Sequence, residues 1–163
     1  MKRADIELTA AELLLAVTCG GLRHIESLAN GRKDRVPGAP CSWTEHIDGC
    51  AAEIAVARFY GLCNFLPTIN AFKLPDVGAI QVRSTRKADG PLIIRPANVD
   101  TETFLLVIAE APWYRIRGAS LGAEAKQERY WRPADRFGPG YYAIPRAELQ
   151  HLPERTVALA KGA

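Results

Sequence analysis

Three residues on a short stretch of the chain have the side-chain types that bind a divalent cation and a phosphate group. Asp76 follows a proline, and Gln81 and Arg83 lie at alternate positions of the apolar run that comes next. Alternate residues of a β-strand point to the same face, so the amide and the guanidinium would lie side by side. Carboxylate and amide oxygens bind Mg²⁺, and a guanidinium binds phosphate bidentately. The spacing predicts a cation and phosphate site at one end of a strand.

A second carboxylate comes from a predicted helix over residues 44–60. Glu53 lies beside Ala52 and Ile54, at the margin of the apolar stripe of this helix. Small neighbours let another element approach, and a carboxylate covered in this way needs a partner charge or a bound cation. A solvated Glu53 on an exposed face is the alternative interpretation. Glu53 and Asp76 are therefore the two candidate carboxylates of one site.

The order of these residues resembles that of the PD-(D/E)XK nuclease superfamily, in which a helix carboxylate precedes a PD motif and a (D/E)-x-K motif. The matching residues are Glu53, Pro75-Asp76 and Gln81-Val82-Arg83, and the resemblance covers about residues 44–145. It implies a restriction-endonuclease-like core, in which helices flank a central mixed β-sheet. The chain also resembles small phage proteins of this type.

The resemblance implies hydrolysis of DNA phosphodiesters with Mg²⁺ or Mn²⁺ as the cofactor. The implied metal ligands are Glu53, Asp76, Gln81 and the backbone carbonyl of Val82. Arg83 would stabilise the charge that develops on the phosphate. Two residues depart from the family pattern, because Gln81 replaces an acidic residue and Arg83 replaces a lysine. The amide lowers the expected affinity for Mg²⁺, and the guanidinium cannot deprotonate to act as a general base.

These departures leave two other functions open. A protein that keeps the fold without catalysis would bind nucleic acid or a protein partner. A phage structural or host-interaction protein would match the motif by chance. DNA affinity that falls steeply with salt favours the first of these, and lack of DNA binding at low salt favours the second.

Basic residues downstream of the motif are candidates for contacts with the DNA backbone, where each Lys or Arg contact releases counterions. A solvated surface is the alternative interpretation. The net charge of +3 excludes a histone-like protein, yet it conceals an acidic excess in residues 44–81 and a basic excess in residues 82–136. The candidates for DNA contacts are Arg86, Lys87, Arg95, Arg115 and Arg117.

The length of 163 residues and the hydrophobic content of 48% indicate one folded domain of mixed α/β (α+β) class. Thr9 and Glu12 form a capping box that predicts a helix over residues 9–30, followed by the helix over 44–60. Short helices are expected at 120–127 and 146–152. Strands are expected at 79–85, 91–96, 103–109, 114–118 and 141–144. The implied organisation is an N-terminal helical addition (1–43), a nuclease-like core (44–145) and a C-terminal helix and tail (146–163).

The cysteines and the N-terminus indicate a cytoplasmic protein without a membrane partner. Acidic residues interrupt the N-terminal apolar run, and no apolar stretch approaches the roughly 20 residues that cross a bilayer. The cysteines lack CxxC spacing and are expected to be reduced thiols, with Cys19 and Cys50 in the core. Many nucleases of this class act as dimers, so the resemblance is compatible with a homodimer, although no dimer face is evident in the sequence and the oligomeric state stays open.

Overall fold

The computed structural model describes residues 4–31, 42–69, 74–134 and 139–154, and it confirms a mixed α/β fold. The elements up to the fourth strand are β1 (Ala4–Glu7), α1 (Ala10–Ala29), α2 (Ser42–Phe59), β2 (Ile80–Thr85), β3 (Leu92–Ile94) and β4 (Thr103–Glu110). The later elements are β5 (Trp113–Leu121), α3 (Gly122–Ala125), β6 (Trp131–Arg132) and β7 (Tyr141–Ile144), with 3₁₀ turns at Glu128–Tyr130 and Arg146–Glu148.

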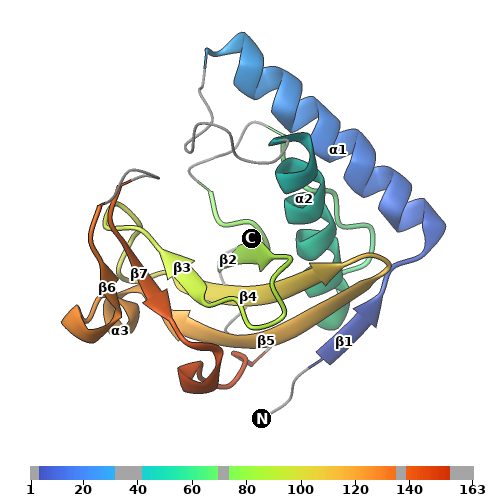
Figure 1. Cartoon of the computed structure of the whole chain (residues 1–163). Coiled ribbons are helices and arrows are strands. Elements are labelled where there is room, and N and C mark those ends of the chain that lie inside the picture. The colour runs from blue at the N-terminus through green and yellow to red at the C-terminus, as the bar shows by residue number, and fades with distance from the viewer. Residues whose placement is uncertain (1–3, 32–41, 70–73, 135–138, 155–163) are drawn as a thin grey trace.

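The strands form two sheets that pack against each other, with the long helices on the outside. One sheet has the order β1-β5-β4-β2, in which β2 runs parallel to β4 and the other pairs are antiparallel. The other sheet has the order β3-β7-β6 and is antiparallel. Figure 1 shows α2 lying over the four-stranded sheet and α1 lying outside α2. In the described ranges no strand pairs with the second edge of β2.

The central strand β4 joins the two halves of the core because its side chains alternate between the two faces of the sheet. One set packs with α2 and the other with β3 and β7, and all of them are buried. The first set is Leu105, Val107 and Ala109, and the second is Phe104, Leu106 and Ile108. Around β4 the sheet is therefore covered on both faces by apolar side chains.

The helix pair is built on a predicted cap and on small residues. The Thr9–Glu12 capping box is confirmed, since the Thr9 amide donates to Glu12 Oε2 (2.7 Å) and the Glu12 amide donates to Thr9 Oγ1 (3.3 Å). A Cβ atom added to Gly20 would lie 2.6 Å from Ile47 Cα. The backbones of α1 and α2 therefore touch at Gly20, and this contact fixes how the two helices lie against each other.

We expect Gly20→Ala to lower the free energy of unfolding by about 1–3 kcal/mol, because its methyl group would meet the Ile47 backbone. The matched control is Gly49→Ala in α2, where an added Cβ meets no heavy atom within 4 Å. The control should gain up to about 1 kcal/mol from the better helix propensity of alanine. Urea unfolding followed by circular dichroism measures both. Equal stabilisation of the two variants would contradict the close contact.

Four local features differ from the sequence-based predictions. The helix expected over residues 146–152 is only a 3₁₀ turn at Arg146–Glu148. The helix expected to start at residue 120 is wrong there, because β5 continues to Leu121 and pairs Ser120 with Phe104 of β4. Only Gly122–Ala125 is helical in that segment. The strands β1 and β6 were not predicted. β1 has only four residues, of which every second one is charged and exposed, and β6 has only two residues, both exposed. β1 nevertheless pairs with β5, so the N-terminal segment adds a strand to the main sheet.

The buried thiols agree with the sequence-based prediction. Cys19 and Cys50 are buried free thiols, as predicted, and Cys63 is an exposed free thiol. Cys41 lies outside the described residues. Within the described ranges, every helix is too short or too polar to cross a lipid bilayer.

Candidate functional site

A tight turn places the Asp76 carboxylate against the outer edge of β2. The Ile80 amide donates to the Val77 carbonyl (2.9 Å), and the Asp76 amide donates to the Ile80 carbonyl (2.9 Å). Gly78 allows this turn because its φ of +60° lies in the left-handed region that favours glycine. As a result, Asp76 Oδ2 accepts a hydrogen bond from the Val82 amide at 2.7 Å.

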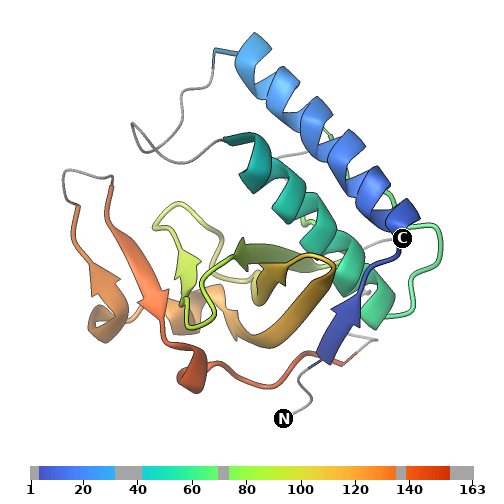
Figure 2. The same cartoon turned by 45° about the vertical axis from the view of Figure 1, so that its right-hand side comes forward.

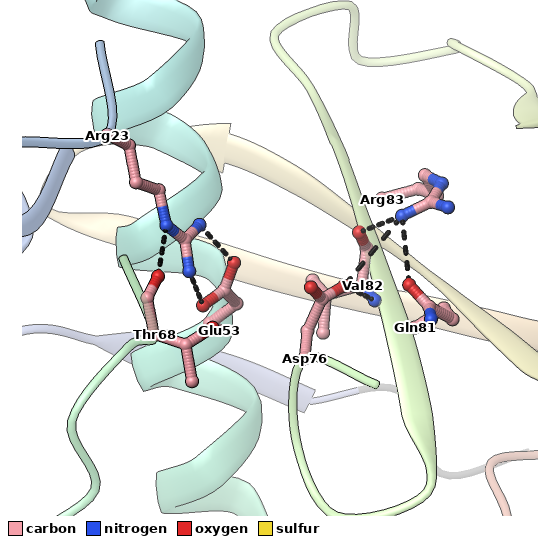
Figure 3. A network of polar contacts seen from close by, with 7 residues as sticks. All are labelled: Arg23, Glu53, Thr68, Asp76, Gln81, Val82 and Arg83. Atoms are coloured by element: carbon pink, nitrogen blue, oxygen red, sulfur yellow. Dashed lines mark hydrogen bonds and ion pairs between the residues drawn. The ribbon is translucent and has the colours of Figure 1, made fainter. Parts of the chain in front are cut away.

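Three of the four predicted ligands converge on the guanidinium of Arg83 (Figure 3). Arg83 Nη1 lies 3.0 Å from the Val82 carbonyl oxygen, 3.5 Å from Gln81 Oε1 and 3.7 Å from Asp76 Oδ2. The guanidinium also lies over the Phe104 ring, 5.1 Å from its centroid. The cluster of Asp76, Gln81 and Val82 oxygens therefore surrounds one point, and a cationic nitrogen occupies that point.

The fourth predicted ligand, Glu53, is bound to a different arginine. Arg23 of α1 donates from Nη1 to Glu53 Oε1 (2.6 Å) and from Nη2 to Oε2 (2.7 Å), and its Nε donates to the Thr68 carbonyl (2.5 Å). The side chains of Arg23 and Glu53 are only 12% and 5% exposed. The solvated interpretation of Glu53 is therefore wrong, and the covered carboxylate has a partner charge. Figure 3 shows Glu53 facing Arg23, with Asp76 on its other side.

The two carboxylates lie in a shared and largely buried electrostatic environment. Burial raises the pKa of Glu53 to about 7, the Arg23 hydrogen bonds oppose this rise, and the Asp76 charge adds to it. Burial also raises the pKa of Asp76, against the Val82 hydrogen bond and the Arg83 and Arg23 charges. The formal charges of Glu53, Asp76, Arg23 and Arg83 sum to zero. The site is thus neutral as a unit.

The donor set at the edge of β2 suits a cation, whereas Glu53 does not. Among the described residues no group of three His, Cys, Asp or Glu side chains is arranged to hold a metal ion. The edge itself offers one carboxylate, one amide and one backbone carbonyl, a set that binds Mg²⁺ when phosphate oxygens and water complete the shell. Both oxygens of Glu53 are already bonded to Arg23. The residues that fit a metal ion are therefore Asp76, Gln81 and Val82.

Three of the predicted DNA-contacting arginines already have acidic partners. Arg86 pairs with Asp48 (2.5 Å), Arg117 pairs with Asp5 (2.9 Å), and Arg115 pairs with Glu110. These pairs do not place the three side chains beside Asp76. Arg86 follows the far end of β2, about 13 Å from Val82 at ~3.3 Å per strand residue.

The other two predicted contacts are basic residues near the small sheet. Lys87 is exposed, and Arg95 follows β3 and is half-buried. The Arg95 amide donates to Asn98 Oδ1 (2.8 Å). The five candidates therefore do not form one patch around the β2 edge.

Sequence reasoning missed Arg23, although its spacing carried a signal. Arg23 follows Ala16 and Gly20 at helical spacing, on the face of α1 that packs against α2. A charged residue at helical spacing from small buried residues predicts a buried partner of opposite charge. Glu53, which lies among the alanines of α2, shows the same pattern. Glu102 was also missed; its charge contributes to raising the pKa of Asp76.

Comparison with models of known protein families, with curated proteins and with solved structures gave no match. The functional argument therefore depends on the geometry of the site.

Proposed function

We propose that the chain has a restriction-endonuclease-like core and hydrolyses DNA phosphodiesters with Mg²⁺ or Mn²⁺ bound at the outer edge of β2. The observation that supports this most directly is the convergence of the Asp76, Gln81 and Val82 oxygens on one cationic nitrogen. Oxygens of these three kinds at one point are a coordination set for a hard cation. The covered sheet behind them supports the proposal, because it fixes the strand that carries them.

Each residue of the edge has a role in this proposal. A bound Mg²⁺ ion supplies Lewis acidity and a water of lowered pKa. Asp76 provides the negative charge that holds the cation, and its hydrogen bond from the Val82 amide fixes its orientation. Gln81 and the Val82 carbonyl provide neutral oxygens.

Arg83 has to leave the oxygen cluster before a metal ion can enter it. A phosphate group of DNA offers two oxygens that match the guanidinium fork, so it is the group that would draw Arg83 away. There the guanidinium stabilises the charge that develops on the phosphate. Glu53 takes no part as a ligand and acts as a charged neighbour whose partner is Arg23.

The test is cleavage of plasmid and single-stranded DNA with Mg²⁺ or Mn²⁺. We expect the wild type to cut and Asp76→Ala to cut about 100-fold more slowly or worse, because the charged ligand is gone. The matched control is Asp89→Ala, which removes an exposed carboxylate from the turn after β2 and should leave cleavage unchanged. A wild type that cuts nothing, or an Asp76→Ala variant that cuts equally well, would refute the nuclease.

A second candidate function is favoured by the arginine partners. Both carboxylates are paired with guanidinium groups and Gln81 is neutral, so the site balances its charge without a metal ion. This arrangement suits a protein that keeps the fold without catalysis and binds nucleic acid or a protein partner. It predicts DNA binding that survives removal of divalent cations and weakens as salt rises. Lack of DNA binding at low salt would rule out both of these functions and leave the third one, a phage structural or host-interaction protein.

A further inference from the structure

Glu102 lies at the end of the four-stranded sheet that also carries Asp76. It directly precedes β4, and the next residue, Thr103, pairs with Ile80 at the start of β2. Asp76 is held at the same place, because its amide donates to the Ile80 carbonyl (2.9 Å). The two carboxylates therefore belong to the same end of two neighbouring parallel strands.

Strand alternation assigns Glu102 to the side of the sheet that carries the oxygen cluster. Gln81 and Arg83 share one side of β2, and Glu102 shares the side of Phe104 on β4. These are the same side, since the Arg83 guanidinium lies over the Phe104 ring (5.1 Å). The ladder of hydrogen bonds extends to Glu102, whose carbonyl accepts from the Gly122 amide (2.9 Å). Figure 2 shows β2 and β4 between α2 and the three-stranded sheet, and this side faces that sheet.

The distance between the two strands is short enough for a shared ion. Gln81 pairs with Phe104, so Glu102 is its diagonal neighbour, with about 8 Å between the two Cα atoms. Two long side chains on one side of a sheet can reach a common ion over this distance. The Glu102 charge also acts on Asp76, because it contributes to raising the pKa of that carboxyl group.

The Glu102 carboxylate has no counter-charge bonded to it. In the part of the chain that the structure describes it forms no hydrogen bond or ion pair, although the residue is half-buried. The nearby cation Lys126 is bonded to other oxygens, since its Nζ donates to Asp100 Oδ1 (2.5 Å) and to the Asn98 carbonyl (2.5 Å). A half-buried carboxylate beside a second carboxylate is unfavourable unless a cation joins them.

The formal charge of the site indicates which cation it suits. The two arginine–carboxylate pairs sum to zero, so Glu102 makes the total −1. The proposed function requires Arg83 to leave the oxygen cluster for a phosphate group, and the total without Arg83 is −2. A divalent cation balances this charge, whereas Asp76 alone would leave it overcompensated.

We propose that Glu102 is a second charged ligand of the divalent cation, which Asp76 and Glu102 hold together from two neighbouring strands. The proposal rests on the proposed function and adds to its ligand set. It also accounts for the neutral Gln81, because the negative charge that this residue lacks is supplied from the strand beside it.

Titration calorimetry with Mn²⁺ on the DNA-free Arg83→Gln protein tests the proposal, because this variant removes the guanidinium from the oxygen cluster. Adding Glu102→Gln should weaken Mn²⁺ binding at least about tenfold. Adding Glu102→Ala instead should weaken it further, since alanine also lacks the amide oxygen. The matched control is Glu110→Gln, which removes a 65% exposed carboxylate at the other end of β4 and should leave binding unchanged.

The outcomes separate this proposal from the proposed function. If Arg83→Gln binds Mn²⁺ and Glu102→Gln does not weaken the binding, Glu102 is not a ligand and the metal site at β2 still stands. Equal weakening by glutamine and alanine would show that Glu102 acts through its charge alone, and would overturn direct ligation. If Arg83→Gln binds no Mn²⁺ with or without DNA, both proposals are refuted.

Thermal unfolding without metal separates a ligand from a side chain that stabilises the fold. Glu102→Gln removes a negative charge beside Asp76, so the Tm should stay the same or rise. Added Mn²⁺ should then raise the Tm of Arg83→Gln more than that of the double variant. A lower Tm of Glu102→Gln without metal would show that the carboxylate already has a stabilising partner, and would overturn the proposal.

Discussion

Replacing Glu53 with alanine should lower the free energy of unfolding by about 3–5 kcal/mol, because it leaves the Arg23 guanidinium buried without its counter-ion. The pair is joined by two hydrogen bonds, and both side chains are nearly inaccessible to solvent. If Glu53 were instead an unpaired metal ligand without its metal ion, Glu53→Ala would raise the free energy of unfolding, because it would remove an uncompensated buried negative charge. The measurement is urea unfolding followed by circular dichroism.

Two further variants separate the ion pair from a simple loss of packing. The double variant Arg23→Met with Glu53→Leu removes both charges and fills the space, so it should recover most of the loss. Asp76→Ala should cost much less, about 1 kcal/mol, because the side chain of its partner Arg83 is 33% exposed. A Glu53→Ala variant as stable as the wild type would show that Arg23 and Glu53 do not form a stabilising pair.

Replacing Arg83 with glutamine should raise the affinity of the DNA-free protein for Mn²⁺ at least about tenfold, or about 1.4 kcal/mol. The reason is that the guanidinium nitrogen lies within 3.7 Å of all three ligand oxygens and repels a metal ion from them. Isothermal titration calorimetry without DNA measures this directly. Adding Asp76→Asn to Arg83→Gln should abolish the gain, since the charged donor of the β2 edge is gone.

Arg86→Gln is the matched control, because it removes an exposed arginine that follows the other end of β2 and pairs with Asp48 of α2. It should leave Mn²⁺ binding unchanged. Weaker Mn²⁺ binding by Arg83→Gln than by the wild type would show that the guanidinium does not compete with the metal ion. Failure of both proteins to bind Mn²⁺, even with DNA present, would favour the candidate function without catalysis.

The parts of the site that are close in sequence were predictable, because local geometry determines them. Strand alternation and a glycine turn are enough to bring Asp76, Gln81 and Arg83 together. The pairing of Glu53 with Arg23 was not predictable in the same way, since the two residues are 30 positions apart and meet only when α1 packs on α2. The sequence indicated that Glu53 needed a partner, and the fold decided which one.

Secondary-structure elements that depend on local sequence were predictable, whereas elements that depend on pairing with distant residues were not. The capping box and the β4 pattern are local, and both predictions are confirmed. The helix expected from residue 120 failed at its start, because pairing of Ser120 with Phe104 of β4 outweighs the helix propensity of the alanine-rich segment. β1 was missed for a related reason, since a four-residue strand is stable only through its distant partner β5.

The hydrogen bond from the Val82 amide to Asp76 has a consequence for solubility. Among the described residues β2 is the last strand of its sheet, and an uncovered edge strand can recruit the strand of another molecule. At that edge the Asp76 carboxylate accepts a hydrogen bond from the Val82 amide, and the Arg83 guanidinium donates one to the Val82 carbonyl. A negative and a positive side chain thus block the position at which a foreign strand would add. The residues proposed to handle DNA therefore also protect this sheet from edge-to-edge aggregation.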